Sequence, residues 1–280
     1  MQKDFKPDLD ISQDSFMESE EEVLRLDVKT DPSAMRRQAL WCGVKPGMRV
    51  LDAGCGSGKT TMLIHELIQP DGQVVGVDYS PGQIAFAEKN YGGKAGLEFH
   101  LQDIKSPLEW LGQFDLILVR FVLEYYRVGA QEIVRNLVKS VKPGGFLCLM
   151  DLDYNSLIYY DMPELMQSTL AKVIDILEDK YNFDTLMGRK LYSYLYDAGL
   201  ENIEVELMAH NLIYGEIRDK DRFNLTTKIE TVLKKLGAVL KAYPGGYDQF
   251  KSDFMKFLLD PRRFTYTPLL LCKGVKPKTA

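Results

Sequence analysis

The chain has 280 residues, of which 45% are hydrophobic and 27% charged, as is ordinary for a soluble globular protein. Its 35 Lys and Arg against 40 Asp and Glu give a formal net charge of −5, which does not favour nucleic acid as the main ligand. No apolar run approaches the roughly 20 residues that cross a bilayer, and the acidic N-terminus lacks the pattern of a signal peptide. Four separated cysteines without a C-x-x-C pair fit a reducing compartment. We therefore expect a cytoplasmic protein with no membrane or nucleic-acid partner and no metal.

From about residue 50, short apolar runs alternate with helical stretches, which is typical of βαβ units and a mostly parallel sheet. The helices between the strands are expected over Gly58–Ile68, from Pro81 onward, and over Ala130–Val141, the last ending at a Lys-Pro-Gly-Gly turn. The expected strands, in chain order, are Arg49–Cys55, Gln73–Tyr79, Leu97–Asp103, Phe114–Phe121, Phe146–Leu152, Glu201–His210 and Tyr266–Gly274.

Two segments depart from this alternation. Pro163–Tyr181 has the apolar spacing of one helix, and Arg222–Leu259 that of two helices broken at a Pro-Gly-Gly sequence. Both would leave from the carboxyl ends of strands, the edge where open α/β sheets bind ligands. We therefore expect helical insertions at about 155–187 and 212–263 to cap the active-site edge.

The sharpest local signal is a glycine-rich turn, VLDAGCGSGKT, over residues 50–60. Glycines at 54, 56 and 58 follow a predicted strand and precede a helix, so the backbone can approach a ligand closely. A P-loop is nearly matched, with alanine replacing the first glycine and Asp151 available as a magnesium-binding carboxylate. That alternative is a nucleotide-triphosphatase using Lys59 and Thr60, although Asp52 would lie close to the phosphates. A dinucleotide G-x-G-x-x-G site fails because Lys59 occupies its third glycine position.

The same turn resembles motif I of the class I S-adenosylmethionine-dependent methyltransferases, V-L-D-x-G-C-G-x-G, in full from Val50 to Gly58. Further landmarks of that family follow in order. An acid ends the second predicted strand at Asp78, and another ends the third at Asp103. FDLI at 114–117 matches the family's fourth strand, and LVKSVKPGGF at 137–146 matches its turn before the fifth. The chain therefore resembles this superfamily, in its small-molecule, type 11-like branch.

The resemblance implies an α/β, Rossmann-like fold. We expect a seven-stranded, mostly parallel sheet whose last strand is antiparallel, with helices on both faces. Residues 1–48 would form an N-terminal helical segment over the cofactor site, and residues 49–280 would form the methyltransferase domain with its two insertions.

The resemblance also implies a binding site for S-adenosylmethionine, released as S-adenosylhomocysteine. Asp78 would accept the ribose hydroxyls, Tyr79 would lie against the adenine, and Asp103 would lie near the adenine amino group. Upstream, Arg25 resembles an arginine that faces the methionine carboxylate in some members. The expected cofactor-binding residues are Arg25, Asp52, Gly54, Gly56, Gly58, Asp78, Tyr79, Gln83, Asp103, Ile104 and Arg120.

Methyl transfer from a sulfonium is an in-line displacement that needs positioning more than a fixed catalytic motif. The stretch after the fourth strand has no proline where the adenine-amine methyltransferases carry [ND]-P-P-[YF], so such an acceptor is disfavoured. His210, at the carboxyl end of the sixth strand, is a candidate general base. Asp153, Glu124 and Tyr125 reach the same edge by topology.

We therefore expect a methyltransferase enzyme that acts on a small molecule, as a monomer or homodimer. The insertions are rich in aromatic residues, which favours a partly apolar or aromatic acceptor if several of them line the cleft. A protein that binds S-adenosylmethionine without catalysis is a second alternative, because motif I indicates binding and not turnover.

Overall fold

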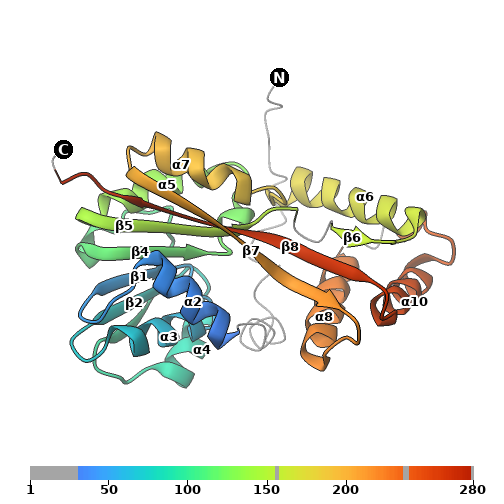
Figure 1. Ribbon diagram of the computed structural model, residues 1–280, viewed down its shortest axis with the longest axis horizontal. Coiled ribbons are helices and arrows are strands. Elements are labelled where there is room, and N and C mark those ends of the chain that lie inside the picture. Colours follow the sequence, from blue (N-terminus) through green and yellow to red (C-terminus); the bar gives the residue numbers. More distant parts are fainter. Residues whose placement is uncertain (1–30, 155–157, 236–239, 279–280) are drawn as a thin grey trace.

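The protein is built on one sheet of eight strands (Figure 1), seen in a computed structural model that describes residues 31–154, 158–235 and 240–278. The strand order is β3-β2-β1-β4-β5-β8-β6, and β7 pairs with the other side of β8. The strands are β1 (Arg49–Ala53), β2 (Gln73–Asp78), β3 (Leu97–Leu101), β4 (Phe114–Arg120), β5 (Val141–Leu152), β6 (Tyr159–Tyr160), β7 (Glu201–Tyr214) and β8 (Phe264–Val275).

Strands β1 to β5 pair in parallel, and β8 runs antiparallel to β5, β6 and β7. This confirms the mostly parallel sheet and the antiparallel last strand. The predicted number of seven strands is wrong by one. The additional strand is β6, two residues inside the first insertion that pair with Phe264 and Thr265 of β8. A strand of two residues is too short to give an alternating pattern, so the sequence carries no sign of it.

Strand β5 begins at Val141, earlier than the predicted start at Phe146, and α5 ends at Lys139 instead of Val141. The Lys-Pro-Gly-Gly sequence therefore lies within the strand. Its backbone is held there by the end of β8: Gly144 N–H donates to the Lys276 carbonyl at 2.8 Å, and Lys276 N–H donates to the Gly145 carbonyl at 2.9 Å. Pairing over a distance of some 130 residues overrides the local tendency of Pro-Gly-Gly to form a turn.

Helices cover both faces of the sheet, as predicted. On one face, Met35, Ile64 and Ile68 of α2 and α3 are fully buried against the strands, and α4 lies beside them. On the other face, Leu137 of α5 and Leu195 of α7 are fully buried. The helices are α2 (Pro32–Cys42), α3 (Lys59–Ile68), α4 (Pro81–Tyr91), α5 (Ala130–Lys139), α6 (Glu164–Lys180), α7 (Leu191–Asp197), α8 (Asp219–Lys235) and α10 (Gly246–Leu259).

The two insertions leave from the ends of β5 and β7, where they were predicted, and they bury a core of their own. This insertion core, separate from the cores on the two faces of the sheet, includes Met166 and Leu170 of α6 together with Phe250, Phe254 and Leu258 of α10. Figure 1 shows α6, α8 and α10 gathered around one end of β7 and β8, away from β1, β2 and β3. Within the described residues, no helix combines the length and the apolar character that crossing a membrane requires.

Helix α2 has clear start and stop signals. The Asp31 side chain caps it by accepting from the N–H groups of Ser33 and Ala34 at 2.9 and 3.2 Å, and Pro32 occupies the first turn. Gly43 ends the helix with a left-handed φ of 94°. Because one side of α2 is buried in the sheet core, its Gln38 is carried toward the carboxyl ends of the strands.

Gly58 is the N-cap residue of α3 and has a φ of 82°. It lies where α3, α4 and β3 meet. A Cβ atom at this position would lie 2.7 Å from Cβ of Ala87 and 2.9 Å from the Phe99 ring. Glycine is therefore required here by backbone conformation and by packing together. Gly93 has a similar φ of 77°, but a Cβ atom there would meet nothing within 4 Å.

We expect Gly58→Ala to lower the free energy of unfolding by about 3 kcal/mol, which combines left-handed strain with overpacking. The matched variant Gly93→Ala adds only the strain and should lower it by about 1 kcal/mol. Urea unfolding followed by circular dichroism measures both values. Equal losses in the two variants would contradict the close packing described for Gly58.

Candidate functional site

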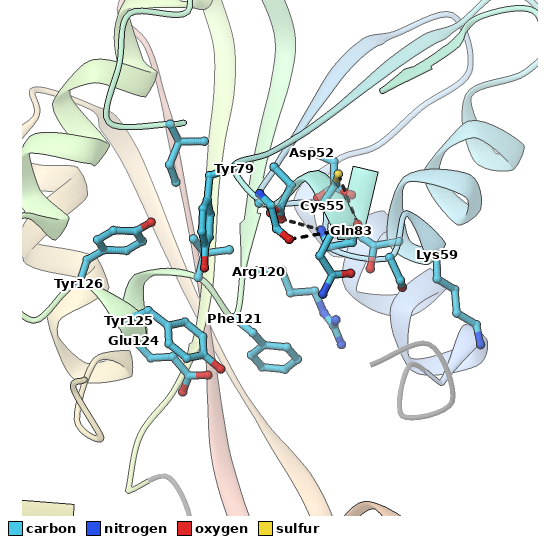
Figure 2. Close-up of a pocket in the computed structure, with 18 of the residues that line it drawn as sticks. Asp52, Cys55, Lys59, Tyr79, Gln83, Arg120, Phe121, Glu124, Tyr125 and Tyr126 are labelled. Atoms are coloured by element: carbon cyan, nitrogen blue, oxygen red, sulfur yellow. Dashed lines mark hydrogen bonds between the residues drawn. The ribbon is translucent and has the colours of Figure 1, made fainter. Parts of the chain in front are cut away.

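A cavity lies at the carboxyl ends of β1, β2, β3 and β4, the edge predicted from topology. Figure 2 shows Glu124 and Tyr125 on one side of it and Asp52, Gln83 and Lys59 on the other. The lining residues are Asp31, Ala34, Gln38, Asp52, Gly54, Cys55, Gly56, Ser57, Lys59, Thr60, Asp78, Tyr79, Ser80, Gln83, Gln102, Asp103, Ile104, Arg120, Phe121, Val122, Glu124, Tyr125, Tyr126 and His210.

The glycine-rich turn forms one wall of the cavity and is tied to β2 through Asp78. Gly56 N–H donates to Asp78 Oδ2 at 2.9 Å, and Ser80 N–H donates to Oδ1 at 3.0 Å. A Cβ atom at Gly54 would lie 2.4 Å from the Val122 side chain, whereas one at Gly56 would approach only Gln83, at 3.9 Å. The backbone at Gly56, with a φ of 52°, is therefore open to a ligand. Burial raises the pKa of the Asp78 carboxyl, against the hydrogen bonds from these N–H groups.

Asp52 ends deep in the cavity wall with only 2% of its surface exposed. Thr61 of α3 donates its hydroxyl hydrogen to Asp52 Oδ2 at 2.6 Å, which joins β1 to α3. Burial raises the pKa of Asp52 to about 6, while the Thr61 hydrogen bond and the charge of Arg120 oppose part of the rise. Asp52 is therefore ionised at neutral pH and takes up a proton in mildly acidic solution.

Arg120, the last residue of β4, is the cation that faces these acids. Its Nε donates to Gln38 Oε1 of α2 at 3.1 Å, and its guanidinium carbon lies 4.2 Å from the centre of the Phe121 ring. Burial lowers the pKa of Arg120 to about 10, against the charges of Asp52 and Asp151. The side chain thus stays charged at neutral pH and connects the helix α2 to the end of β4.

The chain leaves β4 through Phe121, which has a φ of 59°, and a short 3₁₀ turn at Leu123–Tyr125. Glu124 is 5% exposed and lines the cavity. Its N–H donates to Asp151 Oδ2 at 3.0 Å, and its carbonyl accepts from Asp184 N–H at 2.7 Å. Burial, followed by the nearby charge of Glu124, raises the pKa of Asp151 well above its usual range. Asp151 therefore takes up a proton at a higher pH than a free aspartate does.

Most of the residues that the sequence singled out line this cavity. Gly58 does not, because it packs against α4 and β3 instead. Asp153 does not either: its carboxylate accepts two hydrogen bonds from Arg189, at 2.8 and 2.9 Å. Arg25 lies outside the described residues. Those that the cavity brings together are Asp52, Gly54, Gly56, Asp78, Tyr79, Gln83, Asp103, Ile104, Arg120, Glu124, Tyr125 and His210.

Sequence reasoning missed part of the wall. Asp31, Ala34 and Gln38 come from α2, which precedes the recognisable motif by many residues, so no spacing rule connects them to it. Asp151 was considered only as a magnesium ligand, yet an acid inside the apolar run LCLMDL was a usable signal of a buried polar group. In the described part of the chain, no three His, Cys, Asp or Glu side chains are grouped as metal ligands would be.

The aromatic residues of the two insertions were a candidate lining, and the described residues do not support that idea. None of the lining residues in the described part of the chain comes from 155–187 or 212–263. Tyr243 and Phe250 pack against each other in the insertion core, with ring centres 5.1 Å apart. The aromatic rings at the cavity are instead those of Tyr79, Phe121, Tyr125 and Tyr126.

Comparison with solved structures supports the same architecture. Phosphoethanolamine N-methyltransferase 2 of Haemonchus contortus, solved in complex with S-adenosyl-L-methionine, superimposes with a TM-score of 0.58. The superposition covers 95% of this chain and 60% of that one, at 16% identity, and so concerns the fold alone.

Sequence relatives and a family model give the assignment. A protein in transposon TN4556 of Streptomyces fradiae is 30% identical over 55% of this chain, which spans 44% of that protein's length. Juvenile hormone acid O-methyltransferase of Drosophila melanogaster is 23% identical over 75% of this chain and 70% of its own length. The family model described as a methyltransferase domain matches residues 44–199, more than half of the chain. The chain belongs to this family of methyltransferase domains.

Proposed function

We propose that the protein transfers a methyl group from S-adenosylmethionine to a small-molecule acceptor. The observation that carries the proposal is the open cradle at Gly56, whose N–H fixes the Asp78 carboxylate at the cavity wall. A ligand with an amino-acid part needs such a close approach to the backbone, and a ribose needs a carboxylate that accepts from its hydroxyls. Asp78 accepts from the N–H groups of Gly56 and Ser80 through different oxygens, and a carboxylate has about four acceptor positions, so capacity remains for a hydroxyl.

The residues present fit this cofactor. Asp78 would hold the ribose, Tyr79 and Ile104 would pack against the adenine, and Asp103 would accept from the adenine amino group. Asp52 would face the cationic amino group of the amino-acid part. When bound, the cofactor supplies an activated methyl group on a sulfonium, so the chain's own task is to orient the acceptor and exclude water. The name of the juvenile hormone acid relative supports a small-molecule acceptor.

The nucleotide-triphosphatase alternative is less well supported. Lys59 and Thr60 do line the cavity, as a P-loop would require. However, the carboxylates of Asp52 and Asp78 lie in the same wall and would repel the phosphates. The second alternative, binding without catalysis, shares the cofactor site and differs only in turnover.

Calorimetric titration with S-adenosylhomocysteine tests the cofactor site. We expect micromolar binding that Asp78→Ala weakens by about ten-fold or more, roughly 1.4 kcal/mol, because the ribose loses its acceptor. Asp71→Ala, in the exposed turn at the opposite end of β2, should bind as the unchanged protein does. ATP with magnesium is the competing ligand: clear ATP binding that Lys59→Ala abolishes, without binding of S-adenosylhomocysteine, would replace this proposal by the triphosphatase.

The same titration repeated between pH 5 and pH 8 tests the role of Asp52. Below its pKa of about 6, the free protein carries a proton on Asp52 that a cationic amino group must displace. The affinity should therefore fall by up to about ten-fold per pH unit below pH 6, and should not change above pH 7. Asp52→Asn should bind more weakly at pH 8 and lose this dependence. An identical pH profile in the variant would remove Asp52 from the ligand's surroundings.

A further inference from the structure

We propose that the methyl acceptor is a small amine, bound as its ammonium ion against Glu124 and the aromatic rings beside it. This inference rests on the proposed cofactor site and concerns the opposite wall of the same cavity. Figure 2 shows that wall: Glu124, Tyr125 and Tyr126 face the cavity from the segment after β4, across from Gln83 and Lys59.

The charge of the cavity favours cations. Among the described lining residues, five carboxylates stand against two side chains that carry a full positive charge, Lys59 and Arg120. Two of the five, Asp31 and Asp103, also pair with Lys220 and Lys105 outside the lining, which leaves three carboxylates inside it. Arg120 is the last residue of β4 and donates to Gln38 of α2, and Lys59 is the first residue of α3. The carboxylates are Asp31, Asp52, Asp78, Asp103 and Glu124.

Glu124 is the acid whose charge is placed for an acceptor. It is 5% exposed, so its carboxylate is largely removed from water. Burial, and after it the charge of Glu124, raise the pKa of the neighbouring Asp151. Of these two acids, Glu124 is the one that lines the cavity. An opposite charge in contact with a carboxylate favours its ionised form.

The rings around Glu124 are positioned to share in binding a cation. Tyr125 packs edge-on against Phe183, with ring centres 5.4 Å apart. The Tyr125 ring, which lines the cavity together with Tyr126, is therefore held in place by its neighbour before any ligand enters. An ammonium group within about 6 Å of such rings is attracted by their electron-rich faces. A carboxylate or phosphate acceptor would gain nothing from these faces and would be repelled by Glu124.

The chemistry balances for an amine. The ammonium first loses one proton, which Glu124 accepts and releases to water. The nitrogen lone pair then forms a bond to the methyl carbon while the carbon–sulfur bond breaks and its electrons stay on sulfur. The positive charge that leaves the sulfur appears on the methylated nitrogen, beside the same carboxylate and rings.

Three probes of nearly the same shape test the charge preference: choline, its neutral analogue 3,3-dimethylbutan-1-ol, and the anion 3,3-dimethylbutanoate. Each is titrated at pH 8 into the full chain saturated with S-adenosylhomocysteine. We expect choline to bind at least about ten-fold more tightly than the alcohol, and the anion to bind most weakly. Choline binding no tighter than the alcohol, or the anion binding tightest, would overturn the proposal without any variant.

Glu124→Gln assigns the preference to one residue. The ratio of choline to alcohol affinity should fall below about two-fold in this variant, and its affinity for S-adenosylhomocysteine serves as the check that it folds. Asp179→Asn, which neutralises an exposed acid on α6, should keep the full ratio. An unchanged ratio in Glu124→Gln would refute the role of Glu124. Failure of S-adenosylhomocysteine to bind the unmodified protein would refute the proposed function instead, so the two failures are distinguishable.

Discussion

The site depends on one carboxylate that two backbone segments share. Asp78 accepts from Gly56 in the turn after β1 and from Ser80 at the start of α4. The two loops can meet there because β1 and β2 are paired in parallel, Ala53 opposite Val77. Without the sheet register the carboxylate would not reach the turn, and without the glycines the turn could not adopt left-handed φ angles. The geometry of the glycine-rich turn therefore depends on the pairing of β1 with β2.

A second constraint on the site comes from charged side chains that are buried close together. The charges of Asp52 and Asp151 act on Arg120, which contacts α2 through Gln38. This contact places α2 against the end of β4, so a helix outside the repeating βα pattern becomes part of the cavity wall. The insertions, in contrast, bury their apolar side chains in a separate core around Phe250 and Phe254. The described cavity wall is therefore made by the strand ends, the segments and helices that follow them, and α2, while the insertions keep their own packing.

The parts of the fold that local pattern determines could be predicted from the sequence. The first four strands and the glycine turn follow from alternation and spacing, and the acids at 78 and 103 follow from the resemblance to the methyltransferase superfamily. Features set by distant partners could not be predicted. The early start of β5 depends on Lys276, and the short β6 depends on Phe264 and Thr265 of β8. The contribution of α2 to the cavity depends on packing against strands that follow it in the chain.

Burying the Asp52 carboxylate lowers the free energy of unfolding at neutral pH. Its pKa of about 6 exceeds the value of 3.8 for a free side chain, so the folded chain retains a proton that the unfolded chain has lost between about pH 4 and pH 6. The free energy of unfolding therefore falls as the pH rises through that window, by about 3 kcal/mol for this group. A neutral residue at position 52 would avoid the cost. Keeping an ionised acid there at neutral pH is consistent with a ligand that brings its own positive charge, since that charge offsets the cost only when the ligand is bound.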